Sequence, residues 1–229
     1  MPNTPGPWVE EWLSQPRFDR YLRECSGDRE RALATYEWNV LLAHAFLRDA
    51  GHFEVALRNA YDCAIGARWA GSAHWLLDPA SPVQRPLWRV VRGKRLDVNT
   101  PNRTAITNAV RKTGGSAATV TPGAVVAELT FGFWEHLADA AHEQTLWIPY
   151  VYFAWPQGTA RRQVDAGTRS IGGLRNRAAH NEPIFTATSS QSLATIHATL
   201  IGLVSMLNPD LGAHVRQTST VSAVLAQRP

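Results

Sequence analysis

Hydrophobic residues recur along most of this chain at the three- and four-residue spacings of amphipathic helices. The clearest case is the set Leu193, Ile196, Leu200, Leu203 and Leu207, which forms one apolar stripe. Such a stripe is typical of a bundle helix, and the Asn-Pro pair that follows Leu207 is expected to close it. Because the helical pattern continues nearly throughout, the sequence predicts an all-α fold, a helical bundle.

The first region, residues 8–70, predicts two short helices followed by long ones. Asp28 is suited to cap a long helix, because its carboxylate can accept a backbone N–H of the first turn. Gly51 is expected to break or bend that helix, and the periodicity then resumes from Phe53 to Ile65.

The middle region, residues 71–122, is interrupted by Pro79, Pro82, Pro86 and Pro101 and by many other turn residues, and it predicts an irregular insertion of short helices and loops. Within it, Asn102 can cap a helix that Gly114-Gly115 would end. The insertion carries a basic cluster: Arg85, Arg89, Arg92, Lys94 and Arg95. This cluster is either a solvated face or part of a surface that faces RNA.

The third region, residues 123–208, returns to bundle helices. Pro122 can open the first of them, and residues 146–155 form an apolar run that is expected to be a buried connector. A further helix is predicted over residues 159–180, with a bend near Gly172-Gly173, and Pro183 would end it. Residues 209–229 predict one weak C-terminal helix and a tail.

Length and composition fit a single globular domain that spans residues 1–229. The mass is 25.3 kDa and 45% of the residues are hydrophobic, which excludes a disordered chain. No run of 18 apolar residues occurs, and the N-terminus lacks the order of a signal peptide, so we expect a cytoplasmic protein without a membrane segment. Cys25 and Cys63 are too few for a disulfide framework.

The basic residues are almost all arginines. Lysine and arginine total 23, and only Lys94 and Lys112 are lysines. Arginine binds phosphate in a bidentate way and stacks on bases, which suits a nucleic-acid partner. The alternative is that an arginine-rich, alanine-rich chain reflects genomic base composition alone.

The segment 173–183 carries the most specific pattern, in which Arg175 and His180 bracket four residues. On a helix, Asn176 and His180 stand one turn apart on the same face. An arginine, an amide and a histidine near a helix end can clamp a phosphate, orient a group and move protons. The structural alternative is a helix terminus at which cations favour the dipole.

The spacing Arg175-Asn176-x-x-x-His180 resembles the R-x4–6-H signature of HEPN ribonucleases. Three further blocks are similar to the Abi-like (abortive infection) branch of that superfamily: Glu37-Trp38-Asn39, residues 53–60 and residues 129–134. The blocks occur in the family's order over nearly the whole chain, which makes the resemblance more specific than the R-x4-H spacing alone.

The resemblance implies a helical homodimer in which two such motifs meet across one cleft and cut RNA without a metal or another cofactor. The ribose 2′-OH would attack the adjacent phosphate while His180 moves protons, Arg175 stabilises the transition state, and Asn176 holds the imidazole or a phosphate oxygen. Arg177 competes with Arg175 on spacing, but the family pattern favours Arg175. A toxin or phage-defence role is implied, with a cognate antitoxin protein or RNA as a further partner.

The block at residues 53–60 leaves two interpretations open. Glu54 and Arg58 have the i, i+4 spacing of an ordinary helix salt bridge, whereas the resemblance implies that Glu54, Arg58 and Asn59 line or brace the cleft. The block at residues 129–134 is expected to be packing, with Gly132 permitting close helix approach.

A metal site is the weaker alternative. His136, Asp139 and His142 recur three residues apart and could bind a metal, but three ligands along one helix without cysteine support are more often surface residues. No phosphate loop, dinucleotide fingerprint or Gly-x-Ser-x-Gly occurs. The resemblance to HEPN ribonucleases therefore implies a metal-independent endoribonuclease; the alternative is a non-catalytic RNA-binding or partner-binding protein of the same fold.

Overall fold

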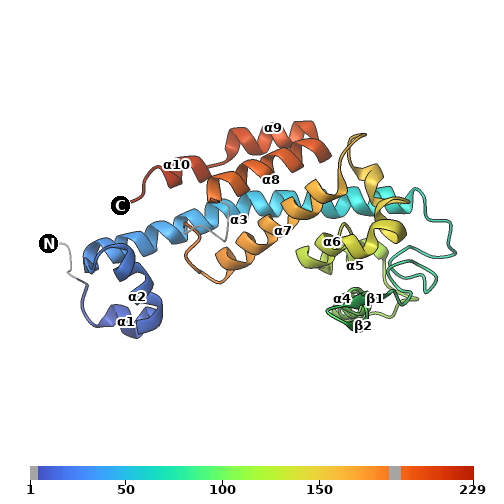
Figure 1. The fold of residues 1–229 in the computed structure, drawn as a ribbon, viewed down its shortest axis with the longest axis horizontal. Helices are drawn as coiled ribbons and strands as arrows, with labels where there is room; N and C mark the ends of the chain where they lie inside the picture. Colours follow the sequence, from blue (N-terminus) through green and yellow to red (C-terminus); the bar gives the residue numbers. More distant parts are fainter. Residues whose placement is uncertain (1–4, 186–191) are drawn as a thin grey trace.

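The computed structural model describes residues 5–185 and 192–229. Within these ranges the protein is all-α, as the hydrophobic pattern predicts, apart from one two-stranded sheet (Figure 1). The α-helices are α1 (Trp8–Leu13), α2 (Gln15–Glu24), α3 (Arg29–Gly66), α4 (Thr100–Lys112), α5 (Pro122–Glu128), α6 (Phe131–His136), α7 (Arg161–Ala179), α8 (Leu193–Leu207), α9 (Pro209–Thr218) and α10 (Val221–Leu225). The strands are β1 (Trp88–Val91) and β2 (Lys94–Asp97), and short 3-10 and π turns form η1 (Ala140–His142), η2 (Glu143–Trp147) and η3 (Val151–Ala154).

The long helix α3 is the spine of the molecule. Asp28 caps it as predicted, with its Oδ1 accepting the Arg31 N–H at 3.0 Å. Its 38 residues span about 57 Å, nearly the full length of the molecule in Figure 1. The predicted break at Gly51 is wrong: the helix continues through this residue. A glycine costs a helix only about 1 kcal/mol, and the flanking Ala50 and Phe53 are buried in the core, so packing outweighs that cost.

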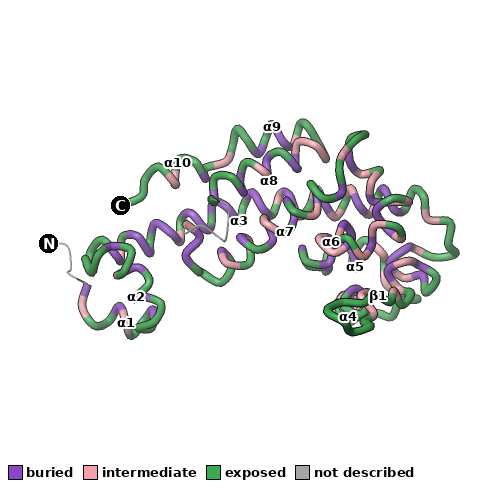
Figure 2. The backbone as a smooth tube through the Cα atoms, viewed as in Figure 1, coloured by how far each residue is buried: buried purple, intermediate pink, exposed green. Residues whose placement is uncertain are grey.

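Three helices run beside this spine. Helices α7 and α8 both pack against α3 and against each other, and α9 packs on α8 (Figure 1). The predicted stripe of α8 is confirmed, because Leu193, Ile196, Leu200 and Leu203 are buried and Leu207 is partly buried. The main core contains the buried residues of α3, α7 and α8 together with buried residues of the insertion, α4, α5, α6 and the η2 and η3 turns (Figure 2). At the N-terminal end of α3, α1 and α2 form a second apolar cluster with the first turns of this helix. Among the described residues, no helix combines the length and the apolar character that a membrane span requires.

The insertion differs from the prediction because it contains a β-hairpin. Strands β1 and β2 pair antiparallel, with Val91 opposite Lys94 next to the turn. Arg92 and Gly93 make that turn, both at positive φ (50° and 75°), as the two-residue turns that match strand twist require. Arg-Gly is a rarer turn pair than Asn-Gly, and each strand has only four residues, so the hairpin signal was weak in the sequence.

The C-terminal region also differs from the prediction, because two helices stand where one was expected. Helix α9 ends at Thr218 and α10 begins at Val221. Between them, Ser219 donates its hydroxyl hydrogen to Asp49 Oδ2 of α3 at 2.5 Å, and this contact fixes the corner between the two helices.

Candidate functional site

The predicted motif lies at the C-terminal end of α7, where the chain turns sharply. Asn181 has a left-handed φ of 52°, its N–H donates to Ala178 O at 3.1 Å, and the Glu182 N–H donates to Arg177 O at 2.9 Å. These two bonds make a Schellman motif, so Asn181 ends the helix before Pro183 is reached. His180 directly follows the last helical residue and is exposed. Its imidazole makes no hydrogen bond to another described residue, and it is therefore available to a ligand.

Arg175 extends from α7 toward α3. Its Nη2 lies 3.8 Å from Glu54 Oε2, and its Nη1 lies 3.4 Å from Asn176 Oδ1. Both contacts are loose, whereas a guanidinium has five N–H donors in a planar fork. The structure thus brings Glu54, Arg175 and Asn176 together beside the end of α7. Glu54 attracts the Arg175 guanidinium without forming a hydrogen bond to it, which leaves most of the N–H donors for an anion.

Arg177, the competing arginine, has a different environment. Its Nη2 donates to Pro183 O, and its Nε lies 3.7 Å from Glu182 Oε2. It closes the turn after α7 instead of facing outward, and this geometry favours Arg175 for a phosphate clamp.

The same turn is held from the other side by a residue that the sequence did not single out for a role. Asn39 of α3 is fully buried; its Nδ2 donates to Glu182 O at 3.2 Å, and its Oδ1 accepts the Ile184 N–H at 2.9 Å. The amide pairs with the backbone on both sides of Pro183, as a neighbouring strand would. Asn39 therefore fixes the path of the chain after His180. Its membership of the Glu37-Trp38-Asn39 block was the only sequence signal.

The other two residues of the predicted block lie away from Arg175. Arg58 Nη1 donates to Ala127 O near the end of α5, at 3.4 Å, and the Arg58 Nε is buried without a hydrogen bond to a described residue. Asn59 is exposed. Of the three candidates, only Glu54 is placed next to the motif.

The close helix approach near the motif occurs at Gly172, and the prediction for Gly132 is wrong. A Cβ on Gly172 would lie 2.9 Å from Phe131 Cε1 and 2.6 Å from Glu135 Oε2, so α7 can contact α6 only with glycine at this position. A Cβ on Gly132 would meet no atom within 4 Å. The rest of its block does pack: Leu129, Phe131, Phe133 and Trp134 are buried.

The three residues weighed as metal ligands are not arranged as a metal site. His142 is fully buried; its Nδ1 lies 2.6 Å from Asp139 Oδ1 and its Nε2 lies 2.8 Å from Asn99 Oδ1. Burial raises the pKa of Asp139, but its bonds to His142 outweigh burial and leave that pKa below its usual range. Burial lowers the pKa of His136. Within the described ranges, no three His, Cys, Asp or Glu side chains converge as metal ligands.

The basic cluster lies on the hairpin and the chain that leads into it. Arg92, Lys94 and Arg95 are exposed, whereas Arg89 is partly buried and donates to Ala141 O at 3.0 Å. The Arg95 guanidinium stacks 5.0 Å above the ring of Trp88, which is itself half exposed. This exposed aromatic among cations was not predicted as a binding residue.

A second polar cluster joins α3, α8 and the α9–α10 corner. His197 Nε2 lies 2.9 Å from Asp49 Oδ2 and 3.2 Å from Ser219 Oγ, and Arg48 Nη1 lies 3.0 Å from Asp49 Oδ1. In a serine–histidine–aspartate triad the acid and the serine contact opposite ring nitrogens, but here both contact the same one. The cluster is therefore structural.

Comparison of the chain with protein-family models, with curated proteins and with solved structures found no match in any of the three.

Proposed function

We propose that this protein is a metal-independent endoribonuclease of the HEPN type, acting in the cytoplasm as a toxin or phage-defence effector. The observation that carries the proposal is the grouping of Arg175, Asn176 and the unpartnered His180 at one exposed helix end, with Glu54 beside Arg175. The R-x4-H resemblance supplies the reaction class, and the local geometry is compatible with it.

In the proposed reaction, the ribose 2′-OH attacks the adjacent phosphorus and the 5′ oxygen of the next nucleotide leaves. One neutral imidazole of His180 accepts the 2′-OH proton, and a protonated imidazole gives a proton to the leaving oxygen. The Arg175 fork binds the non-bridging oxygens, on which charge builds up in the transition state. The products are a 2′,3′-cyclic phosphate and a 5′-hydroxyl end.

This reaction needs both a base and an acid, whereas each chain offers one His180. We therefore propose a homodimer in which the two motifs share one cleft, so that the second imidazole comes from a second copy. The exposed face of α7 near the motif contains Gly173, Asn176 and Ala179, which are small or uncharged and permit close approach. A cognate antitoxin protein or RNA would act by covering this face.

The test is cleavage of single-stranded RNA by the wild type, by His180→Ala and by a matched control, His44→Ala, which removes an exposed histidine of α3. We expect His180→Ala to slow cleavage by about 100-fold or more, the usual size of acid–base catalysis, and His44→Ala to leave the rate unchanged. Cleavage should continue in excess EDTA, and a 2′-deoxyribose at the scissile position should block it. Equal rates for the wild type and His180→Ala would overturn the proposal.

The exposed hairpin favours a second candidate, a non-catalytic RNA-binding protein. Trp88 and Arg95 stack on each other beside Arg92 and Lys94, which form no ion pair with a described acid, and such a combination can bind RNA without any catalytic group. RNA binding without His180-dependent cleavage would favour this candidate.

A further inference from the structure

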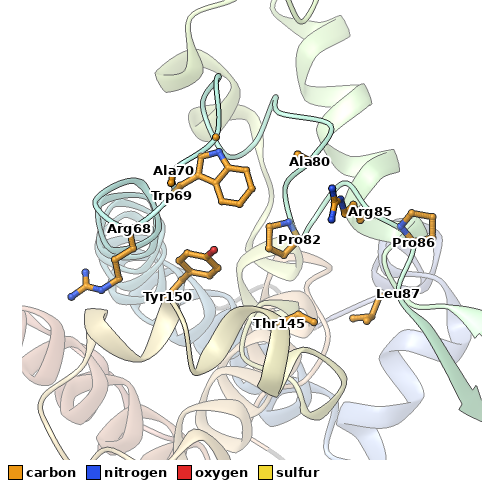
Figure 3. A pocket seen from close by; sticks show the side chains of 11 residues that line it. Arg68, Trp69, Ala70, Ala80, Pro82, Arg85, Pro86, Leu87, Thr145 and Tyr150 are labelled. Carbon is orange, nitrogen blue, oxygen red and sulfur yellow. The ribbon is translucent and has the colours of Figure 1, made fainter.

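A cavity of about 670 Å³ opens between the end of α3, the first part of the insertion and the η2–η3 turn (Figure 3). Trp69 and Tyr150 form one wall, Arg85, Pro86 and Leu87 form the other, and Thr145 lies between them. The volume falls within the range of sites that hold small ligands. Among the described residues, no carboxylate lines the cavity.

The aromatic wall is fixed before any ligand binds. The rings of Trp69 and Tyr150 meet at 63° with centroids 6.3 Å apart, and Trp69 Nε1 donates to Ala73 O at 3.1 Å. Asp78 orders the loop behind this wall, because its carboxylate accepts the Ala80 N–H at 2.8 Å. Gly71 fits against Trp69 and Asp78 with no room for a side chain. A planar ligand therefore meets a preformed stacking surface.

Thr145, Tyr150 and Arg85 bring polar groups to the walls of the cavity. The Thr145 hydroxyl is buried and has no hydrogen-bond partner among the described residues, and Tyr150 directs its hydroxyl into the cavity (Figure 3). Arg85 stands at the rim and forms no ion pair with a described acid, whereas the Arg68 guanidinium is held 3.6 Å from the Phe153 ring and points away. A buried hydroxyl without a partner is costly, so a ligand that bonds it gains affinity.

We propose that this cavity is a base-binding subsite for single-stranded RNA, in which one base stacks on the Tyr150 ring beside Trp69, its edge bonds Thr145, and the adjoining phosphate contacts Arg85. The chain that leaves Arg85 enters the hairpin, where Trp88, Arg92, Lys94 and Arg95 continue an aromatic and basic path. Glu54 at the motif and Gly66 at the end of α3 are about 18 Å apart along the helix, so the subsite and the motif would contact different nucleotides of one strand. The inference rests on the proposed function, to which it adds a determinant of specificity.

The test measures binding apart from cleavage, in a His180→Ala background. Fluorescent single-stranded homopolymers of A, C, G and U are titrated by anisotropy into that protein and into versions that also carry Tyr150→Leu, Thr145→Val or Arg85→Gln. Arg20→Gln is the matched control, because it removes an equally exposed arginine on α2, at the other end of the molecule (Figure 1). Circular dichroism checks that every variant is folded.

We expect Tyr150→Leu to weaken binding at least about fivefold, since stacking on one aromatic contributes about 1–3 kcal/mol per base. Thr145→Val should narrow the differences in affinity between the four homopolymers, because the hydroxyl that reads the base edge is lost. Arg85→Gln should reduce the slope of log K against log salt by about 0.7, the amount for one phosphate contact to a single strand, and Arg20→Gln should not.

Two results separate this inference from the proposed function. If all three cavity variants bind RNA within twofold of the Arg20→Gln control, the subsite is wrong, whatever the cleavage assay shows. If they lose binding as expected while the wild type does not cut RNA, the subsite is supported and the proposed catalysis fails.

Discussion

Two arginines of the motif differ in how many of their N–H donors remain free to bind a ligand. Arg175 and Arg177 are two positions apart on α7, but Arg177 is occupied by the carbonyl of Pro183, whereas Arg175 makes only loose contacts with Glu54 and Asn176. A spacing rule alone cannot separate them. The deciding fact is the turn at Asn181, which folds the chain back over Arg177.

The role of Arg175 can be tested against a lysine at the same position. Arg175→Lys should recover little of the activity that Arg175→Ala loses, because a point charge cannot reproduce a bidentate fork on phosphate. RNA affinity should fall less than the cleavage rate in both variants. The matched control is Arg162→Lys, an exposed residue about 20 Å away on the same helix. Wild-type rates for Arg175→Lys would show that only the charge matters.

The Asp49–His197–Ser219 cluster predicts part of the pH dependence of stability. Burial raises the pKa of Asp49, but the bonds from His197 and Ser219 outweigh it and hold that pKa below its usual range. The folded state therefore binds this proton less tightly than the unfolded state. The stabilisation is present above a pH of about 4 and is lost as the pH falls through the lower, folded pKa.

Urea unfolding of the wild type and of Asp49→Asn, at neutral pH and at several values below 4, checks this. At neutral pH the variant should be less stable by about 1–3 kcal/mol, because a buried charged acceptor is lost. Its stability should then fall less steeply with acid than that of the wild type. Parallel curves for the two proteins would contradict the assignment.

At the scale of elements, the contact between α6 and α7 sets the position of the motif. Gly172→Ala should destabilise the fold by about 1–3 kcal/mol, because the new methyl group would overlap Phe131. The neighbouring Gly173→Ala is the matched control: its Cβ would meet no atom within 4 Å, and alanine favours a helix interior, so stability should rise by up to about 1 kcal/mol. Thermal unfolding of the two variants shows whether stability falls in Gly172→Ala and rises in Gly173→Ala. Equal changes in stability for the two variants would mean that the packing of α7 does not depend on its contact with α6 at Gly172.

The position and the buried face of a helix could be predicted from the sequence where neighbouring residues determine them. Asp28 capped its helix and the α8 stripe was buried as expected, because a cap and a periodic face need no knowledge of distant residues. Two errors arose where tertiary packing decides: Gly51 is tolerated by the burial around it, and Gly172 is required by Phe131, forty-one positions earlier in the chain. A third error was local: α4 begins at Thr100, so Asn102 lies buried inside the helix and does not cap it. In the site, the spacing of Arg175 and His180 was visible in the sequence. The bracing of their turn by Asn39 was not, since Ile184 lies 145 residues further on.

At the scale of the whole molecule, α3 connects the features that we assign to RNA. In the first half of α3, Asn39 fixes the turn after His180. Further along the helix Glu54 lies beside Arg175, and just beyond its end Trp69 forms one wall of the cavity. One continuous helix therefore sets the separation between the proposed cleavage site and the proposed base subsite. The continuity of α3 through Gly51 therefore matters for the proposed function, because a bend at Gly51 would move the two proposed sites relative to each other.

The homodimer is the prediction that belongs to this scale. Each chain supplies one His180 and one Arg175 on an exposed surface, and the reaction needs a base and an acid together, so activity should require two copies. Light scattering should give about twice the chain mass of 25.3 kDa, and cleavage per chain should fall on dilution through the dimer dissociation constant. Gly173→Arg, on the exposed face of α7 next to the motif, should make the protein monomeric and should also lower its cleavage rate. Gly202→Arg, at an exposed position of α8 where a Cβ would meet no atom within 4 Å, should leave both the dimer and the cleavage rate unchanged. A monomer that cuts RNA at an undiminished rate per chain would show that one motif is sufficient.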